Sequence, residues 1–405
     1  MEQSSEFLKP SGRGAITSCA NAGKVERRIV QIGMHGLNRA AGGVDRYVDG
    51  LARGLFDLGQ LGRVGVFSGI EAQTDENLRN LGSSDMPLMK RWKAIRRFMQ
   101  GELGDEEGVV ASHFALYALP VVVPPGRAVH VAHFHGPWAL ESRNEGQGRI
   151  AVWLKRQVEL RVYRRAARCI VLSKAFADIL RNDYGVSPDR IRIVPGGVDT
   201  AQFTPRLGRQ EARKNLGWRV TGPIVFCVRR LARRMGIDVL LEAFVEVRKQ
   251  HPTARLMIGG KGAIAEELAE WGAALGLGDA VTWLGFVREE DLPLCFEAAD
   301  LSVVPSQSLE GFGLVAVESL ACGTPVLVTP VGGMPEVVTG LDPRLVLTGS
   351  TSSAIAAGLC SALAAPEQLP SSTVCREYAE RNFAWSHIAR RVLTVYQEAA
   401  GQFAR

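Results

Sequence analysis

Two carboxylates lie eight residues apart, Glu310 just before a Gly-Phe-Gly turn and Glu318 beyond it. The apolar run 301–304 before the turn is typical of a buried strand. The run 314–320 after it is typical of a helix that ends at a Gly/Pro signal. The turn is therefore predicted to lie at the carboxyl end of a strand, where open α/β sheets bind ligands.

This spacing suits a ligand that carries phosphate. A helix that begins near Phe312 leaves its first backbone amides unpaired, at the positive end of the helix. Such an end suits a diphosphate, so the amides of Phe312, Gly313 and Leu314 are candidate ligands of one. Eight helical positions span at most about 12 Å, so the two carboxylates can accept hydrogen bonds from hydroxyls at both ends of a nucleotide-sugar. An ordinary loop with two solvated glutamates has the same spacing.

The segment Glu310–x7–Glu318, with a Pro-Ser before it, resembles the donor-site signature of retaining glycosyltransferases of family 4. The resemblance extends from about residue 29 to the C-terminal end. It implies the GT-B fold, an α/β architecture in which two Rossmann-like domains with parallel sheets face each other across a cleft. It implies a nucleoside-diphosphate sugar donor and transfer with retention, without a cofactor or a divalent metal. Glu310 would hold sugar hydroxyls, and Glu318 would hold the ribose.

A glycine pair, Gly42-Gly43, follows the first expected strand and opens a helix. On its own, such a pair predicts only a turn. The family has a glycine pair at this place beside the donor diphosphate, so the resemblance implies that Gly42 and Gly43 bind the donor.

Three histidines, His130, His133 and His135, lie in an expected strand and just after it. A metal site needs further ligands, and no acidic residue is close by in the sequence. The family has a histidine at the end of this strand that contacts the donor sugar, and His135 matches it. We assign His135 to the reaction centre and regard His133 as structural. Glu141 is a candidate for the acceptor side.

Four arginines follow the first strand of the C-terminal half within six residues, and they are Arg229, Arg230, Arg233 and Arg234. Charge runs are usually solvated, but this run lies at a loop that can bind ligands. The family pattern is Gly-Arg-Leu, three variable residues and Lys-Gly. Arg230 matches the arginine, whereas Met235 stands at the lysine. Arg234 or Arg233 is expected to supply the missing charge, although a guanidinium binds differently from an ammonium.

The composition is that of a globular protein with more than one core. At 405 residues the chain exceeds the size at which single cores stop growing. Seven scattered cysteines indicate a reducing cytoplasm and argue against a disulfide framework. No signature of a nucleic-acid-binding module is present. Residues 1–28 lack the apolar core of a secretory signal and are predicted to be disordered.

Alternating strands and helices predict two parallel sheets. We expect an N-terminal acceptor-binding domain over 29–205, completed by a helix at 386–405, and a donor-binding domain over 206–385. The expected strands are 28–33, 64–67, 109–111, 129–134, 169–172 and 191–194 in the first half, and 224–228, 255–258, 281–284, 301–304 and 326–328 in the second.

The segment 87–99 has apolar residues at helical spacing with five basic residues between them. A basic amphipathic helix of this kind is a candidate membrane-surface element, which would make a cytoplasmic protein peripheral to an anionic membrane. A surface helix packed on its own domain explains the pattern at least as well.

Other functions share parts of this pattern. A GT-B-like epimerase or phosphorylase would keep the fold, but the paired glutamates and the arginine loop favour transfer. A non-catalytic nucleotide-sugar-binding protein is disfavoured by the presence of Glu310, His135 and Arg230. The sequence leaves the nucleotide base open, and also the acceptor: a polysaccharide, a lipid-linked sugar, a membrane lipid or a small metabolite.

Overall fold

The computed structural model of the chain describes residues 28–35, 42–60, 62–67, 78–219 and 221–401. The predicted disordered tail, apart from Arg28, lies outside the described residues, as does the end of the expected last helix beyond Gly401.

The first sheet has seven parallel strands in the order β3-β2-β1-β4-β5-β6-β7. They are β1 (Arg28–His35), β2 (Gly62–Phe67), β3 (Leu78–Asn80), β4 (Gly108–Ser112), β5 (Val129–Phe134), β6 (Arg168–Val171) and β7 (Ile191–Ile193). Every residue of β4, β5 and β6 is buried, as in parallel strands that are covered on both faces. The edge strand β3 is not predicted from the sequence, because three residues are too short a pattern.

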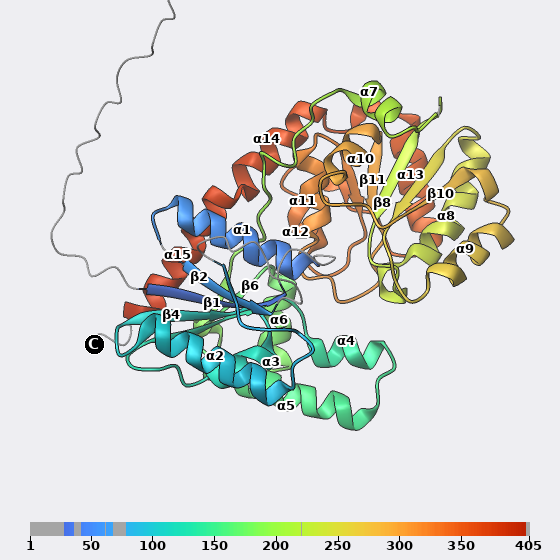
Figure 1. Ribbon diagram of the computed structural model, residues 1–405. Coiled ribbons are helices and arrows are strands. Elements are labelled where there is room, and N and C mark those ends of the chain that lie inside the picture. Colours follow the sequence, from blue (N-terminus) through green and yellow to red (C-terminus); the bar gives the residue numbers. More distant parts are fainter. Residues whose placement is uncertain (1–27, 36–41, 61, 68–77, 220, 402–405) are drawn as a thin grey trace, which may run out of the picture.

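Helices cover both faces of this sheet (Figure 1). On one face, α1 (Gly43–Asp57) packs against β1 and β2. The last helix, α15 (Trp385–Gly401), packs against α1 and against β4, β5 and β6, so the end of the chain returns to the first sheet. The other face carries α2 (Leu88–Leu103), α3 (Ala115–Ala118) and α5 (Arg149–Arg165). Two shorter helices, α4 (Trp138–Asn144) and α6 (Lys174–Asn182), follow β5 and β6.

The second sheet has five parallel strands in the order β10-β9-β8-β11-β12. They are β8 (Ile224–Val228), β9 (Arg255–Gly259), β10 (Val281–Gly285), β11 (Leu301–Val304) and β12 (Val326–Val328). The predicted bounds of these strands agree with the structure to within one residue. The helices of this half are α7 (Arg209–Asn215), α8 (Ile237–Gln250), α9 (Ala265–Ala274), α10 (Leu292–Ala298), α11 (Leu314–Ala321), α12 (Met334–Val338), α13 (Ser352–Ala364) and α14 (Ser372–Phe383).

Helix α2 is the predicted amphipathic helix, and its apolar side faces its own sheet. Ile95 and Met99 are buried, and the indole Nε1 of Trp92 donates to the carbonyl of Leu116 at 3.0 Å. The aromatic residue is therefore held by the protein itself. Within the described ranges, no helix has both the length and the apolar composition needed to span a bilayer.

Candidate active site

The Gly-Phe-Gly turn places free amides at the start of α11. The helix begins at Leu314, as the apolar run 314–320 predicts, and Gly313 before it has a φ of +80°, which glycine adopts without strain. A Cβ atom at Gly311 would lie 2.5 Å from Cε2 of Phe176, so this position also requires glycine. The amides of Phe312, Gly313 and Leu314 have no hydrogen-bond acceptor among the described residues. They form a group of donors at the positive end of a helix.

The glycine pair of the first half lies opposite this turn. Gly42 precedes α1, and its amide donates to Oδ2 of Asp45 at 3.3 Å. A Cβ atom at Gly43 would lie 3.8 Å from Cδ1 of Leu314. Because Leu314 is the first residue of α11, the starts of α1 and α11 meet, one from each half of the chain.

Glu310 is buried in an ion pair with Arg229, and the two side chains are only 13% and 8% exposed. The Arg229 guanidinium also donates to Oγ of Ser306 (2.9 Å) and contacts Sδ of Met235 (2.9 Å). Ser306 Oγ in turn donates to Oε2 of Glu310 (2.9 Å). Burial acts to raise the pKa of Glu310, but Arg229, Ser306 and Arg234 together hold it below its usual value. Glu310 is therefore a carboxylate whose Oε2 is fixed, while Oε1 has no partner among the described residues.

The other arginines of the loop after β8 point in different directions. Arg230 is 59% exposed and pairs with Glu145, between α4 and α5, at 2.7 Å. Arg233 is 69% exposed and pairs with Glu267 on α9. Neither guanidinium lies beside the carboxylate of Glu310, whereas that of Arg229 does.

Arg234 links the loop before α11 to helix α4, which follows β5. Its Nη2 lies 3.5 Å from Oε1 of Glu141, and its Nη1 donates to the carbonyl of Leu309 at 3.4 Å. Leu309 is the one non-glycine residue with a positive φ (52°) in the described part of the chain, and such strain is concentrated at functional sites. A Cβ atom at Gly136 would lie 3.0 Å from Oε1 of Glu141, so this carboxylate lies beside the residue that follows His135. Through Glu141, Arg234 therefore reaches the turn that follows His135.

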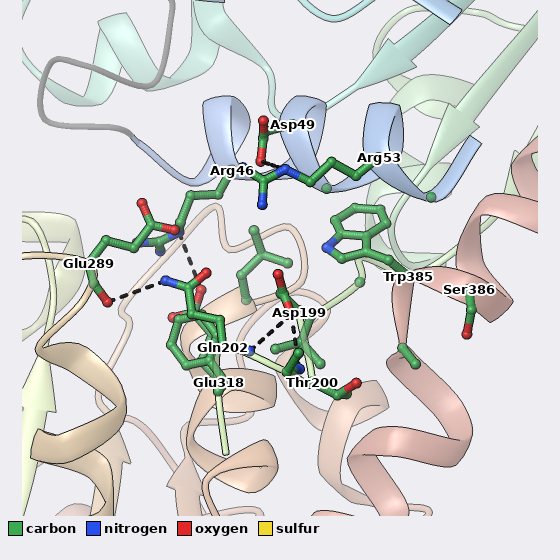
Figure 2. Close-up of a pocket in the computed structure, with 18 of the residues that line it drawn as sticks. Arg46, Asp49, Arg53, Asp199, Thr200, Gln202, Glu289, Glu318, Trp385 and Ser386 are labelled. Atoms are coloured by element: carbon green, nitrogen blue, oxygen red, sulfur yellow. Dashed lines mark hydrogen bonds and ion pairs between the residues drawn. The ribbon is translucent and has the colours of Figure 1, made fainter. Parts of the chain in front are cut away.

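Glu318 is buried on α11 and faces Arg46 on α1, with Oε1 3.3 Å from Nε. Its Oε2 and the Nε of Arg46 have no hydrogen-bond partner among the described residues. Burial raises the pKa of Glu318, Arg46 opposes this effect, and Glu289 adds to it. Figure 2 shows both side chains beside a cavity that extends along α1 to Trp385. Its volume of about 590 Å³ is within the range of small-molecule sites.

A hydrogen-bonded row of three side chains runs from the core of the first sheet to His135. Gln31 lies on β1 and His113 follows β4, and both are buried. Oε1 of Gln31 is 2.9 Å from Nε2 of His113, and Nδ1 of His113 is 3.1 Å from Nε2 of His135. Neither Gln31 nor His113 is predicted to be near the site from the sequence.

His133 lies behind this row and is held by tyrosines from two helices. Its Nδ1 is 3.3 Å from the hydroxyl of Tyr47 on α1, and its Nε2 is 2.7 Å from that of Tyr396 on α15. These contacts favour the structural interpretation of His133. Burial lowers the pKa of His130 to about 4 and that of His135 to about 3. Burial also holds the pKa values of His113 and His133 well below the usual range, so all four rings are neutral near pH 7.

His113, His133 and His135 have ring nitrogens within 4.8 Å of one another, close enough for one metal ion. Their planes, however, are nearly parallel, with interplanar angles of 29°, 22° and 15°. The lone pairs of parallel rings do not converge on one point, as a tetrahedral site requires. The arrangement fits a hydrogen-bonded network better than a metal site.

Two family models match the chain over nearly all of its described length. Residues 41–202 match Glycosyltransferase Family 4, and residues 208–382 match Glycosyl transferases group 1. The chain belongs to the group 1 glycosyltransferases. The resemblance inferred from Glu310 and Glu318 is therefore confirmed.

Two curated relatives in this family show how far the similarity extends. The chain is 32% identical to a D-inositol 3-phosphate glycosyltransferase from Segniliparus rotundus over 276 residues, which are 67% of this chain and 61% of the relative. It is 32% identical to a mannosylfructose-phosphate synthase from Agrobacterium fabrum over 240 residues, 51% of this chain and 50% of the relative. The chain thus matches between half and about three fifths of these relatives' length.

Solved structures show that the fold is GT-B. A sucrose-phosphate synthase from Thermosynechococcus elongatus superposes with a TM-score of 0.78 at 23% identity, over 93% of this chain and 100% of that one. Anabaena HepE, solved in complex with UDP and glucose, gives a TM-score of 0.74 at 18% identity, over 91% and 99% of the two chains. The expected α/β fold with two parallel sheets is confirmed.

Arg229, Arg46, Gln31 and His113 are the site-lining residues that the sequence does not reveal. Arg229 occupies the glycine position of the family pattern, next to Arg230. In the structure its guanidinium lies against Met235, which stands where the family has its lysine. Arg229 and Met235 both depart from the family pattern, and their side chains contact each other. Two departures within one short motif are the sequence signal that could have identified Arg229.

Proposed function

We propose that the chain is a retaining, metal-independent glycosyltransferase that moves a hexose from a nucleoside-diphosphate sugar to a hydroxyl acceptor. The observation that carries this proposal is the meeting of three groups at one place: the carboxylate of Glu310, the free amides at the start of α11, and the buried guanidinium of Arg229. HepE, with the same fold, binds UDP and glucose in its solved complex, which supports a donor of this class.

Each part of the site has a role in this reaction. Glu310 accepts hydrogen bonds from sugar hydroxyls through its free Oε1, His135 contacts the same sugar, and Glu318 binds the ribose. The amides of Phe312 to Leu314 and the turn at Gly42-Gly43 receive the diphosphate.

Negative charge grows on the diphosphate as the glycosidic bond breaks, and fixed donors at that point are the strongest catalytic contribution. Arg229 and Arg234 would supply them, and Arg230 would join the two by leaving Glu145. Two unit charges 4 Å apart interact by about 4 kcal/mol at an effective dielectric of 20. The departing phosphate would take the proton of the acceptor on the same face of the sugar, which gives retention.

A ligand screen followed by a transfer assay tests the proposal. Purified protein in EDTA is heated with UDP, GDP or ADP and with their common sugar conjugates. A ligand at about 100 times its Kd adds roughly 2.7 kcal/mol to the unfolding free energy. We expect stabilisation by one nucleotide family, and release of that nucleotide from its sugar conjugate when acceptors are added. No response to any nucleotide would contradict the proposal.

Matched variants separate catalysis from binding alone. Glu310→Gln should keep nucleotide binding and lose nearly all transfer, whereas Glu267→Gln, an exposed glutamate on α9, should change neither. If wild-type protein binds the nucleotide-sugar but never releases the nucleotide, the alternative of a non-catalytic binding protein is favoured. The anomeric configuration of the product, read by NMR, tests retention.

We also propose that the first half contacts an anionic membrane surface, and that α5 rather than α2 supplies the inserting residues. Ile150, Trp153 and Leu154 on α5 are 78%, 58% and 53% exposed. In Figure 1, α5 and α2 cover the same face of the first sheet. Both helices also carry exposed basic residues, and they are Lys90, Lys93, Arg96, Arg97, Arg149, Arg161, Arg164 and Arg165. Apolar and aromatic residues surrounded by basic ones are typical of interfacial binding.

Sedimentation with vesicles tests this contact. Wild-type protein should bind phosphatidylglycerol vesicles and not phosphatidylcholine vesicles. Trp153→Ser should weaken this binding, while Trp271→Ser, at a tryptophan 42% exposed on α9, should not.

We also propose that the acceptor-binding domain comprises residues 29–205 together with 386–405, and that the donor-binding domain comprises residues 206–385.

A further inference from the structure

We propose that Gln31 and His113 are positioning residues that fix the tautomer of His135, so that His135 acts as a hydrogen-bond acceptor towards the donor sugar. This inference rests on the proposed glycosyltransferase function for the role of His135. It goes beyond that function because it assigns a direction to each hydrogen bond from the core of the first sheet to the cleft.

The direction follows from Gln31. Its Oε1 lies 2.9 Å from Nε2 of His113, and a carbonyl oxygen can only accept, so Nε2 of His113 carries the hydrogen. In a neutral ring the other nitrogen, Nδ1, is then an acceptor. Nδ1 of His113 lies 3.1 Å from Nε2 of His135, which must therefore donate. His135 is left with a lone pair on Nδ1.

Burial keeps both rings in one protonation state. Gln31 and His113 are 0% and 2% exposed. Burial and the neighbouring His133 and His135 hold the pKa of His113 well below its usual value, so the ring does not become a cation near neutral pH. The His113 ring is also stacked on His133, with centroids 4.3 Å apart, and its backbone amide donates to the carbonyl of Ile32 at 3.0 Å. The row is thus rigid as well as neutral.

The free nitrogen of His135 is the one available to a ligand. Nδ1 of His135 has no hydrogen-bond partner among the described residues, and the ring is only partly buried. With the tautomer fixed, Nδ1 accepts a hydrogen bond from a sugar hydroxyl and repels a group that has only lone pairs to offer. The row therefore selects a donor sugar with a hydroxyl at the position facing His135.

The nitrogen NMR spectrum of ligand-free protein tests the assignment without any substrate. In protein labelled with ¹⁵N-histidine, the His135 resonances, identified with a His135→Gln variant, should show a protonated Nε2 and an unprotonated Nδ1. Gln31→Met removes the acceptor at nearly the same size and should mix the two tautomers. Gln31→Glu keeps an oxygen at this place and should restore the wild-type pattern. A protonated Nδ1 in wild-type protein would overturn the proposal.

Kinetics with the nucleotide-sugar that gives the largest stabilisation in the ligand screen, measured as release of its nucleotide, then link the tautomer to function. Gln31→Met should lower kcat/KM about tenfold, the effect of one lost hydrogen bond, and Gln31→Glu should recover most of it. Tyr396→Phe removes a hydroxyl from His133, not from His135, and should change neither the spectrum nor the rate. An unchanged rate in Gln31→Met with mixed tautomers would refute the link to sugar binding. An inactive wild-type protein with the expected spectrum would instead count against the proposed function.

Discussion

The two walls of the cleft hold their polar groups by different physical means. In the first half, Gln31, His113 and His135 form a neutral row with no charged member. In the second half, Glu310 and Arg229 form a buried ion pair. A neutral network can orient a sugar without titrating near pH 7, whereas the charged wall lies where a leaving diphosphate needs positive charge. Orientation and charge stabilisation are thus divided between the two halves.

Removing Arg229 should have the largest effect on this arrangement. Arg229→Leu leaves the buried carboxylate of Glu310 without its cation, and breaking such a pair costs about 3–5 kcal/mol of stability. We expect transfer to fall about a thousandfold, which corresponds to about 4 kcal/mol of transition-state stabilisation. Steady-state kinetics and urea unfolding measure the two losses.

Arg233→Leu is the matched control, because Arg233 is exposed and pairs with Glu267 outside the cleft. The double variant Arg229→Leu/Glu310→Gln should regain stability, since no lone buried charge remains, but it should stay inactive. Equal losses in Arg229→Leu and Arg233→Leu would show that the loop acts only through its overall charge.

The neutral wall should make the fold sensitive to acid. His113, His130, His133 and His135 have folded-state pKa values below their unfolded value of about 6.5. Their contribution to stability is therefore complete above about pH 6.5 and is lost as the pH falls towards 4, where the unfolded chain binds protons that the folded chain does not. Each histidine contributes a slope of about 1.4 kcal/mol per pH unit. Urea unfolding at several pH values measures the summed slope.

Buried carboxyl groups with raised pKa values, among them Glu141, Glu159 and Glu318, act in the opposite direction. Burial raises the pKa of Glu159 to about 7, so this group gains stability as the pH falls and offsets one histidine. His130→Gln should flatten the acid slope by one histidine, because the amide does not titrate. A stability that is constant from pH 7.5 to 5 would mean that the cluster is open to solvent.

Glu318 differs from Glu310 in that its unpaired carboxylate oxygen is itself buried. Its Oε2 is buried with no partner among the described residues, and burial raises its pKa. A ribose hydroxyl would satisfy this oxygen, so Glu318→Gln should weaken nucleotide binding about tenfold, while kcat changes by less than about twofold. Calorimetry with UDP, GDP and ADP measures the binding. Glu290→Gln, at an exposed residue beside the same cavity, should leave it unchanged.

The sequence predicts one wall of the cleft better than the other. Short apolar runs predict the strands of the second sheet. Glycines that no other residue type can replace without strain, such as Gly313 with its positive φ, mark the start of α11. The row to His135 depends instead on the pairing of β1 with β4 and of β4 with β5, which no local pattern encodes. For the same reason His113 is not predicted, although it lies only 22 residues before His135.

The smallest effect is expected at Arg230, although its position matches the family pattern better than that of Arg229. Neighbouring residues at the end of a strand point to opposite sides, and here Arg229 points into the site while Arg230 reaches the rim and Glu145. An exposed ion pair contributes about 0–1 kcal/mol, so Arg230→Ala should lower kcat/KM by less than about fivefold. Glu145→Gln, which removes the other member of the pair, should have an equally small effect. A hundredfold loss of kcat/KM in Arg230→Ala, without a loss in Glu145→Gln, would show that Arg230 leaves Glu145 and binds the diphosphate during the reaction. Both Arg229 and Arg230 would then supply positive charge to the leaving diphosphate.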